Sequence, residues 1–346
     1  MTDTILLKVE DLKVHFHLDE GVLKAVDGIS FEIHQGRTLG IVGESGCGKS
    51  VSSFALLRLL PDTAKLSGSV EYFKENAQQT EQILELSDSK LRDIRGGGIA
   101  MIFQEPMKAF SPVHTIGNQI SEAVMLHVEP NPEKAREIVL DALRKVGMSN
   151  PEQRIDEYTH QLSGGMRQRA LIAMSIACRP RILIADEPTT ALDVTVQAQV
   201  LDLISQLKEE FGSAVIFITH DLGVIAEMSD EVAVMYLGKI VEYADVDTLF
   251  HDTMHPYTRA LMRSMPDFHD SGDKTDRLET IEGTVPYPMN LPPGCGFYSR
   301  CKQRVEGRCN VEEIPLTDMG EKHGVRHLVR CLFTTRKESG GEKNDA

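Results

Sequence analysis

The chain has 346 residues, which is enough for one large domain and a smaller one. Its composition, 41% hydrophobic and 26% charged, is that of a soluble globular protein. The net charge of −15 argues against a surface that follows nucleic-acid phosphates, so we expect no nucleic-acid partner. No apolar run is long enough to cross a bilayer and no secretory signal is visible, which predicts a protein in the cytoplasm.

The first motif in chain order is GESGCGKS, which matches G-x-x-x-x-G-K-[ST] in full. We expect a short strand before it and, over KSVSSFALLRLL, a helix ended by Pro61. Its glycines let the backbone wrap around phosphates where a Cβ would clash, and the helix N-terminus attracts the anion. Lys49 is expected at the β- and γ-phosphates, and Ser50 at Mg²⁺. The residues predicted to bind nucleotide here are Gly43, Glu44, Ser45, Gly46, Cys47, Gly48, Lys49 and Ser50.

The span from about 88 to 165 is predicted to be a helical insert, with NPEKAREIVLDALRKVGM as its clearest amphipathic helix. The stretch HQLSGGMRQRALIAMSIACRP then predicts a helix capped by Ser163. Gly164 and Gly165 leave the start of that helix bare, so its free N–H groups predict a second phosphate-binding feature. Two such features in one chain favour two chains with nucleotide between them.

The stretch RILIADEPTTALD predicts a strand over Ile182 to Ala185. Asp186 follows at the carboxyl end of the strand, where it is expected to bind Mg²⁺, and Glu187 is expected to orient or deprotonate the attacking water. The next helix, VTVQAQVLDLISQLKEEFG, is predicted to stop at Gly212. This alternation of strands and helices predicts an α/β fold with a mainly parallel sheet.

These motifs together resemble those of the ATP-binding cassette (ABC) ATPases. LSGGM is similar to the signature motif of that family, and its distance from the phosphate loop fits. The resemblance covers about the first three-quarters of the chain. It implies a P-loop NTPase-type fold, ATP and Mg²⁺ as ligands, and a head-to-tail dimer. In that dimer ATP lies between residues 43–50 of one chain and 163–165 of the other.

The resemblance also implies roles for residues that would be unremarkable alone. Phe16 is similar to the aromatic residue that stacks on adenine, and Asp193 to the residue that links the two sites of a dimer. Gln104 is similar to the glutamine that senses Mg²⁺ and water and touches the membrane subunits. His220 is similar to the histidine that contacts the γ-phosphate. The implied catalytic residues are Glu187, Gln104 and His220.

The segments HPYTRALMRSMP and EGTVPYPMNLPPGCGFYSRC resemble the C-terminal extension of the oligopeptide and dipeptide importer ATPases. This implies the energy-coupling subunit of a membrane importer on the cytoplasmic face of the membrane. Its implied partners are a second, non-identical ATPase, two transmembrane permease subunits and an extracytoplasmic binding protein. Importers of oligosaccharides, nickel chelates or glutathione stay open, because the same group includes them. A soluble repair- or chromosome-type ABC ATPase is a further alternative, but the chain has no sustained heptads.

These features divide the chain into a nucleotide-binding domain over 1–254 and a small cysteine-rich extension over 255–333. Residues 266–280 are polar and are predicted to form a linker or exposed loop. The tail over 334–346 has no apolar pattern and is expected to be disordered.

Four of the six cysteines lie in the extension, spaced C-x5-C-x7-C-x21-C: Cys295, Cys301, Cys309 and Cys331. In the cytoplasm a metal or redox site is favoured over disulfides. Four thiolates suit Zn²⁺ or an iron–sulfur cluster, and the absence of C-x2-C pairs lowers the case for zinc. Resemblance to the peptide-importer ATPases implies a [4Fe–4S] cluster, with Zn²⁺ or free packed thiols as alternatives. His323 and His327 are possible ligands, although a surface position suits them better.

Two cysteines lie elsewhere. Cys47, between two glycines of the phosphate loop, is expected to be a small filler. Its place near a helix N-terminus alternatively predicts a thiol with a lowered pKa. Cys178, at the end of the signature helix, is expected in the core.

Overall fold

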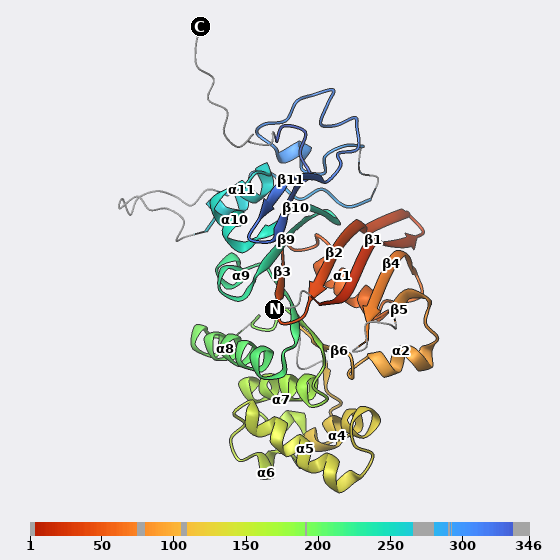
Figure 1. Cartoon of the computed structure of the whole chain (residues 1–346), viewed down its shortest axis with the longest axis vertical. Helices are drawn as coiled ribbons and strands as arrows, with labels where there is room; N and C mark the ends of the chain where they lie inside the picture. The colour runs from red at the N-terminus through yellow and green to blue at the C-terminus, as the bar shows by residue number, and fades with distance from the viewer. Residues whose placement is uncertain are drawn as a thin grey trace, which may run out of the picture.

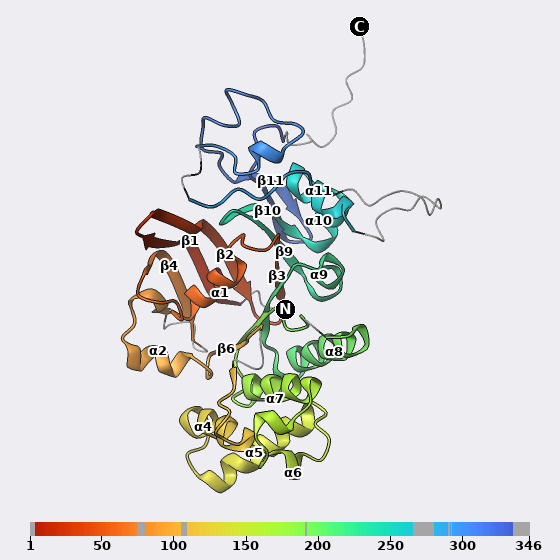
Figure 2. The same ribbon diagram turned by 180° about the vertical axis from the view of Figure 1, so that it is seen from behind.

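The computed structural model describes residues 4–74, 80–104, 109–190, 192–265, 280–289, 291 and 293–334. Residues 266–279 of the predicted linker and 335–346 of the predicted tail lie outside this part. The described chain forms an eight-stranded sheet with the order β11-β12-β10-β9-β3-β8-β7-β6 and a four-stranded sheet with the order β2-β1-β4-β5. Figures 1 and 2 show the small sheet on one flank of the large one and the helices α4 to α7 in a separate lobe.

The centre of the large sheet is parallel, as predicted. Its parallel strands are β3 (Thr38–Val42), β6 (Ile99–Ile102), β7 (Ile182–Asp186), β8 (Ala214–Thr219) and β9 (Glu231–Tyr236). Every residue of these strands is buried. Strands covered on both faces are near-continuous apolar runs, which is why β3 and β7 could be predicted from the sequence. β6 falls within the span predicted as a helical insert, yet it pairs with β7 and belongs to this sheet.

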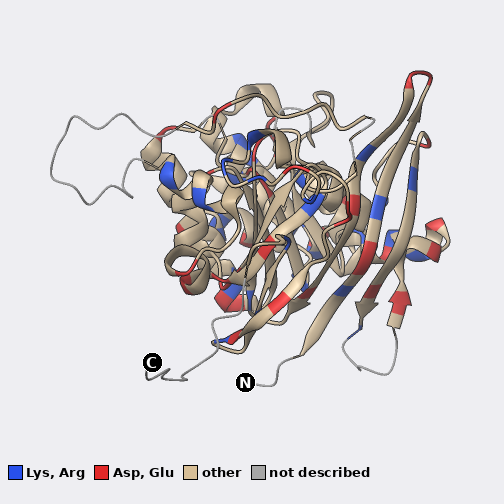
Figure 3. Ribbon diagram, turned by 90° about the horizontal axis from the view of Figure 1, so that it is seen from above, with Lys and Arg blue, Asp and Glu red and all other residues tan. Residues whose placement is uncertain are grey.

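The small sheet is antiparallel, and motif reasoning did not predict it. It contains β1 (Ile5–Leu18), β2 (Gly21–His34), β4 (Ala64–Phe73) and β5 (Thr80–Gln82). The pairing of β1 with β2 shifts register at several points, so the alternation of apolar and polar residues is interrupted along both strands. Lys residues and acidic residues are interspersed along the strands of this sheet, as Figure 3 shows.

The helix after the phosphate loop, α1 (Lys49–Leu56), ends earlier than predicted. Arg58 adopts a left-handed conformation with φ 50°. The N–H of Leu59 donates to Phe54 O and the N–H of Arg58 donates to Ala55 O, at 2.9 and 3.0 Å. This pair of bonds closes the helix as a Schellman motif, before Pro61 has any effect.

The other helices follow their end signals more closely. α5 (Pro132–Lys145) is capped by Asn131 and ends beside Gly147, and α8 (Val194–Phe211) ends at Gly212, both as predicted. The remaining helices are α2 (Asp88–Ile94), α4 (Ile116–His127), α6 (Pro151–Arg154), α7 (Gly164–Ile176), α9 (Leu222–Met228), α10 (Val246–His251) and α11 (Pro256–Arg263). Short 3-10 turns occur at Ile83–Glu85 (η1), Thr159–Gln161 (η2) and Tyr298–Arg300 (η4). Among helices of the described part, none has the length and apolar character needed to cross a bilayer.

The C-terminal residues extend the large sheet through three further strands. β10 (Lys239–Asp245) pairs antiparallel with β9 and with β12 (Val325–Val329), and β11 (Thr317–Lys322) pairs with β12. An aromatic cluster of Tyr236, Tyr257 and Phe297 also lies across the junction, with ring centroids 4.6 to 5.4 Å apart. The extension therefore shares sheet and core with the strands that precede it.

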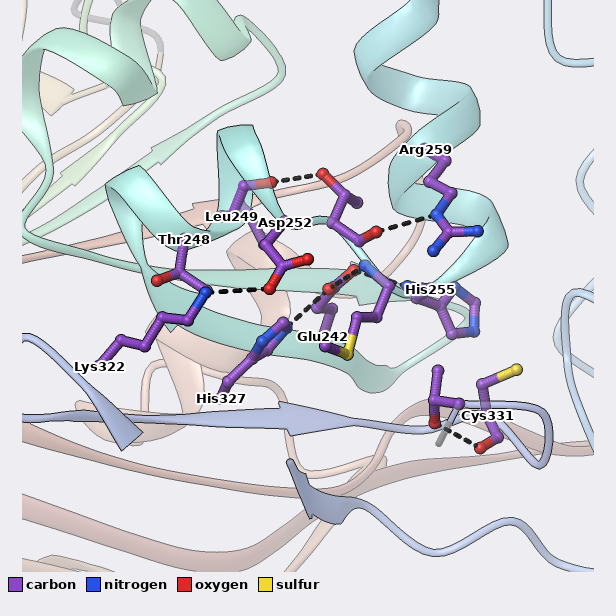
Figure 4. A network of polar contacts seen from close by, with 12 residues as sticks. Glu242, Thr248, Leu249, Asp252, His255, Arg259, Lys322, His327 and Cys331 are labelled. Atoms are coloured by element: carbon purple, nitrogen blue, oxygen red, sulfur yellow. Dashed lines mark hydrogen bonds and ion pairs between the residues drawn. The ribbon is translucent and has the colours of Figure 1, made fainter. Parts of the chain in front are cut away.

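A buried carboxylate fixes this junction (Figure 4). Glu242 is fully buried and accepts hydrogen bonds from the N–H groups of Met254 and His255, at 2.7 and 3.0 Å, and pairs with His327 Nε2 at 2.9 Å. The surface position expected for His327 is thus wrong, because its ring is the buried partner of a carboxylate that needs one. His323 is exposed, as expected, and pairs with Asp245.

Candidate nucleotide site and four-cysteine site

The phosphate loop, residues 43–50, connects the carboxyl end of β3 to α1. Lys49 is buried and its Nζ donates to the carbonyl oxygens of Gly43 and Glu44, at 2.7 and 3.3 Å. Ser50 Oγ donates to Asp186 Oδ1 at 3.0 Å. β7, which ends at Asp186, is parallel to β3 with only β8 between them, so their carboxyl ends meet at one edge of the sheet. Ser50 and Asp186, the two predicted Mg²⁺ ligands from these strands, are therefore together.

The glycines of the loop are required by neighbouring backbone of the protein itself. A Cβ on Gly43 would lie 2.2 Å from Met235 O, and one on Gly48 would lie 2.3 Å from Ala25 O. A Cβ on Gly46 would meet nothing within 4 Å, although its φ of +80° is left-handed. Contacts within the protein thus explain why positions 43 and 48 are glycine, without any clash between a Cβ and phosphate. Tight packing against β2 and β9 already fixes the path of the loop.

Cys47 fills the space beneath this loop and is 1% exposed. Burial raises the pKa of its thiol, although the Lys49 ammonium nearby acts in the opposite direction. The filler interpretation is therefore the one that fits, and the lowered pKa is not found. Cys178 is half-buried against the helical core, and burial raises the pKa of its thiol to about 11.

Asp186 is 1% exposed, and burial raises the pKa of its carboxyl to about 6. The hydrogen bond from Ser50 lowers the pKa, whereas the charge of Glu187 raises it. A buried carboxylate with one hydroxyl donor is short of positive charge. A hard divalent cation beside Ser50 and Asp186 would supply that charge, so the donor set fits Mg²⁺.

The three residues predicted to be catalytic lie together. Gln104 and His220 both contact the carboxylate of the third residue, Glu187. Glu187 Oε2 accepts hydrogen bonds from Gln104 Nε2 at 2.8 Å and from Thr190 Oγ1 at 2.9 Å. Glu187 Oε1 lies 3.4 Å from His220 Nδ1. Glu187 itself has a left-handed backbone with φ 47°, an uncommon conformation that marks functional positions. Sequence reasoning missed Thr190, for which the only signal is its position three residues after Glu187.

The signature residues lie at the start of α7, in the lobe of α4 to α7. Ser163 caps α7 by accepting from the N–H of Met166 at 3.3 Å, as predicted. A Cβ on Gly164 would meet nothing within 4 Å, so this helix start is open. Figures 1 and 2 show α7 far below α1, so one chain does not bring residues 163–165 to its own phosphate loop. Asp193 caps α8, accepting from the N–H of Val196 at 3.0 Å.

Phe16 lies on β1, half-buried against the core of the small sheet. Its partner across the β1–β2 hairpin is Leu23, and two residues further along β2 the carbonyl of Ala25 faces Gly48. The predicted adenine-stacking residue is therefore on the strand pair that borders the phosphate loop. Sequence reasoning also missed two contacts to Glu44, which come from Tyr257 and Arg300 of the extension.

The four cysteines of the extension line one small pocket, together with apolar side chains such as Phe297, Ile314 and Leu332. Cys301 and Cys309 are buried, and Cys295 and Cys331 are half-buried. Burial raises the pKa of the Cys295 thiol to about 11 and also raises the pKa of Cys301 and Cys331. The neighbouring cysteine thiolates add to these shifts by repulsion, which agrees with the position of all four around one pocket.

No three of the four cysteine sulfurs lie within 4.8 Å of one another. Tetrahedral Zn²⁺ with bonds of about 2.3 Å holds its sulfurs about 3.8 Å apart. Within the described residues, the one group of three His, Cys, Asp or Glu ligand atoms that all lie within 4.8 Å is Asp245, Asp247 and His323. The cysteine sulfurs of the structure are therefore not gathered into the compact set that a single Zn²⁺ would hold.

Comparison with known proteins identifies the family. The family model for ABC transporters matches residues 26–190, and that for the oligopeptide/dipeptide transporter C-terminal region matches residues 241–309. The probable peptide ABC transporter ATP-binding protein y4tR of Sinorhizobium fredii is 51% identical over 322 residues, 93% of this chain and 94% of that one. This chain belongs to the ABC transporter ATPases. The predicted family is thereby confirmed.

Further relatives align with this chain over almost their whole length. The oligopeptide transport ATP-binding protein AppD of Bacillus subtilis is 42% identical, with 98% of this chain and 99% of that one covered. The dipeptide transport ATP-binding protein DppD of Escherichia coli is 44% identical, with 91% and 94% covered. Among solved structures, the dimeric ATP-binding cassette MJ0796 bound to ADP and Pi matches with a TM-score of 0.61 and 25% identity, covering 70% of this chain and 99% of that one. The predicted α/β cassette fold is confirmed.

The glycine contacts lead to a stability prediction. Gly43→Ala is expected to lower the free energy of unfolding by about 3 kcal/mol, because the new methyl must displace the Met235 carbonyl. Gly46→Ala is the matched control in the same loop and should cost about 1 kcal/mol, from its left-handed φ alone. Urea unfolding followed by circular dichroism measures both variants. Equal losses would contradict the packing explanation.

Proposed function

We propose that this chain is the ATP-hydrolysing, energy-coupling subunit of a membrane importer for di- or oligopeptides. The proposal rests on two features that occur together in this chain, a nucleotide site and a C-terminal region of the peptide-transporter type. A phosphate loop, a buried Asp186 and the cluster around Glu187 share one sheet edge, and the C-terminal region matches the oligopeptide/dipeptide transporter type. The relatives named for peptide, oligopeptide and dipeptide transport support the same substrate class.

ATP is proposed to bind with its phosphates against the amides of residues 43–50 and the N-terminus of α1. Lys49 exchanges its bonds to loop carbonyls for bonds to the β- and γ-phosphates. Ser50 and Asp186 hold Mg²⁺, which neutralises phosphate charge when it is bound. Phe16 stacks on the adenine. In this arrangement the loop backbone is set by protein packing before nucleotide arrives, so little reorganisation opposes binding.

Hydrolysis is proposed to use Glu187 as the group that orients the attacking water or takes its proton. Gln104 and Thr190 both donate to Glu187 Oε2, which leaves Oε1 as the oxygen for water. His220 lies beside Oε1 and is exposed, so it can reach a γ-phosphate bound at the loop. The bonds that hold Glu187 in place fix the direction from which water attacks.

A head-to-tail dimer is proposed to complete each site. Ser163, Gly164 and Gly165 sit at an open helix start that the same chain does not use, so the phosphates it binds belong to a site on another chain. Asp193 lies close in sequence to Glu187 and links the two sites. The solved cassette dimer with ADP and Pi supports this assembly. ATP binding closes the dimer and release of products opens it.

The complete importer is proposed to contain a second, non-identical ATPase, two transmembrane permease subunits and an extracytoplasmic binding protein. This chain then lies on the cytoplasmic face of the cell membrane, with Gln104 and its neighbourhood against the permeases. The same machinery could carry oligosaccharides, nickel chelates or glutathione. The names of the relatives favour peptides.

Cys295, Cys301, Cys309 and Cys331 are proposed to hold a [4Fe–4S] cluster. They line a common pocket with apolar side chains, two of them are buried and two half-buried, and no three of their sulfurs form a compact set within 4.8 Å. Thiolate ligands suit such a cluster, and its binding free energy would hold together a segment with little core of its own.

The role of Glu187 is tested by Glu187→Gln. This variant keeps an oxygen that can accept from Gln104 and Thr190, so ATP binding should stay within about threefold of the wild type. Turnover should fall by at least about 100-fold, because an amide cannot take the proton of the attacking water. Single-turnover hydrolysis and equilibrium ATP binding separate the two effects. Near-normal turnover would refute the assigned role.

The cluster is tested by iron, sulfide and zinc analysis of protein purified without oxygen. We expect about four irons and four sulfides per chain, as [4Fe–4S] requires. The variant Cys301→Ser should lose iron, while Cys178→Ser, with a cysteine outside the pocket, should retain it. Stoichiometric zinc without sulfide would refute the cluster.

The importer assignment is tested by purifying a tagged chain from native membranes and identifying its partners by mass spectrometry. We expect one further ATPase, two permeases and a binding protein. Uptake of labelled dipeptides and oligopeptides by cells should then fall when the gene is deleted. Recovery of this chain alone would count against the importer.

A further inference from the structure

An acidic residue in the phosphate loop needs an explanation. Glu44 is the second residue of a loop whose ligand is a polyanion. A carboxylate at this position repels phosphate groups, and the repulsion is strongest where solvent is excluded. Outside the loop itself, Glu44 has hydrogen bonds with two residues, and both come from the C-terminal extension.

The first partner is Arg300, which pairs with Glu44 through both terminal nitrogens of the guanidinium. Arg300 Nη1 donates to Glu44 Oε2 at 2.6 Å and Nη2 donates to Oε1 at 3.0 Å. The Arg300 side chain is only 4% exposed. The pairing raises the pKa of Arg300 further above its ordinary value, so the guanidinium stays charged. A two-point, shielded pair of this kind is among the strongest ionic contacts in proteins.

The position of Arg300 is itself fixed by the cysteine-bearing segment. Arg300 ends the turn η4, in which the N–H of Tyr298 donates to Cys295 O at 2.9 Å and that of Cys301 donates to Tyr298 O at 3.3 Å. The guanidinium also lies over the ring of Phe297, 5.9 Å from its centroid. The turn between two cysteines therefore points this cation at the phosphate loop.

The second partner is Tyr257, from α11. The backbone N–H of Glu44 donates to the Tyr257 hydroxyl at 2.9 Å, and Tyr257 is fully buried. Backbone and side chain of Glu44 are thus both held by residues more than 200 positions later in the chain. Packing alone would not need a charged pair at this place.

We propose that Arg300 is a positioning residue for nucleotide binding. It neutralises the carboxylate of Glu44 inside the phosphate loop and, with Tyr257, fixes the first turn of that loop. The C-terminal extension thereby sets the affinity of the site for the phosphates of ATP. This proposal rests on the proposed ATP site, since it assumes that nucleotide phosphates bind at residues 43–50.

The test uses the full-length chain and equilibrium titration with a fluorescent ATP analogue in the presence of Mg²⁺. Arg300→Gln leaves Glu44 uncompensated and should raise Kd about tenfold. The double variant Arg300→Gln with Glu44→Gln removes the stranded charge and should bind the analogue more tightly than Arg300→Gln alone. Arg304→Gln is the matched control, because Arg304 is exposed in the same segment and packs over Tyr298 instead.

A merely structural role predicts a different pattern. If Arg300 served only to hold the fold, the double variant would bind as weakly as Arg300→Gln or more weakly, and the proposal would be overturned. Wild-type affinity in Arg300→Gln would overturn it as well. Lys49→Ala separates this from failure of the ATP site. If Lys49→Ala lost binding while Arg300→Gln bound normally, the site would stand and only the role of Arg300 would fall. A wild-type chain that bound no analogue would contradict the ATP site itself.

Discussion

The hydrogen bond from Ser50 to Asp186 joins the two halves of the nucleotide site, and much of the fold serves to make it possible. Its partners are 136 residues apart in sequence. They meet because β3 and β7 run parallel on either side of β8 and end at the same edge. The strands are buried on both faces, so this edge cannot shift without disturbing the core. Lys49 is adjacent to Ser50, and Glu187 is adjacent to Asp186. The bond between Ser50 and Asp186 therefore also fixes where Lys49 and Glu187 lie.

The C-terminal extension is part of the same construction. β12 continues the large sheet beyond β10, and the buried pair of Glu242 and His327 closes the junction. Removing one member of such a pair would leave the other buried without compensation, which proteins tolerate poorly. Tyr257, in the aromatic cluster, connects this junction to the phosphate loop, because its hydroxyl accepts the hydrogen bond from the N–H of Glu44. Phe297 of the same cluster also lines the cysteine pocket.

Much of the nucleotide site could be predicted from the sequence because its signals are local. The glycine pattern, the strand before Asp186 and the caps at Ser163 and Gly212 all depend on neighbours within a few residues. The end of α1 escaped prediction because Arg58 took the left-handed position that usually belongs to glycine. The small antiparallel sheet escaped because register shifts interrupt its alternation of apolar and polar residues.

Long-range polar pairs were beyond sequence reasoning for a different reason. A buried histidine and a surface histidine look alike in sequence, and only the fold brings Glu242 to His327, 85 residues away. The same holds for Glu44, whose partners leave no local signal. Its charge fitted the loop pattern at a position where any residue is allowed, so nothing indicated that it required an arginine.

The separation of Glu44 from Arg300 has a consequence for synthesis of the protein. The two residues are 256 positions apart. At roughly 5 to 20 residues per second, a ribosome makes Arg300 about 13 to 50 seconds after Glu44. Throughout that interval the nascent chain contains the phosphate loop, but Glu44 has no Arg300 to neutralise its carboxylate. A chain that is released early, or cut before η4, retains every motif of an ATPase but lacks this contact. The phosphate loop therefore has its full set of contacts only after translation has passed Arg300.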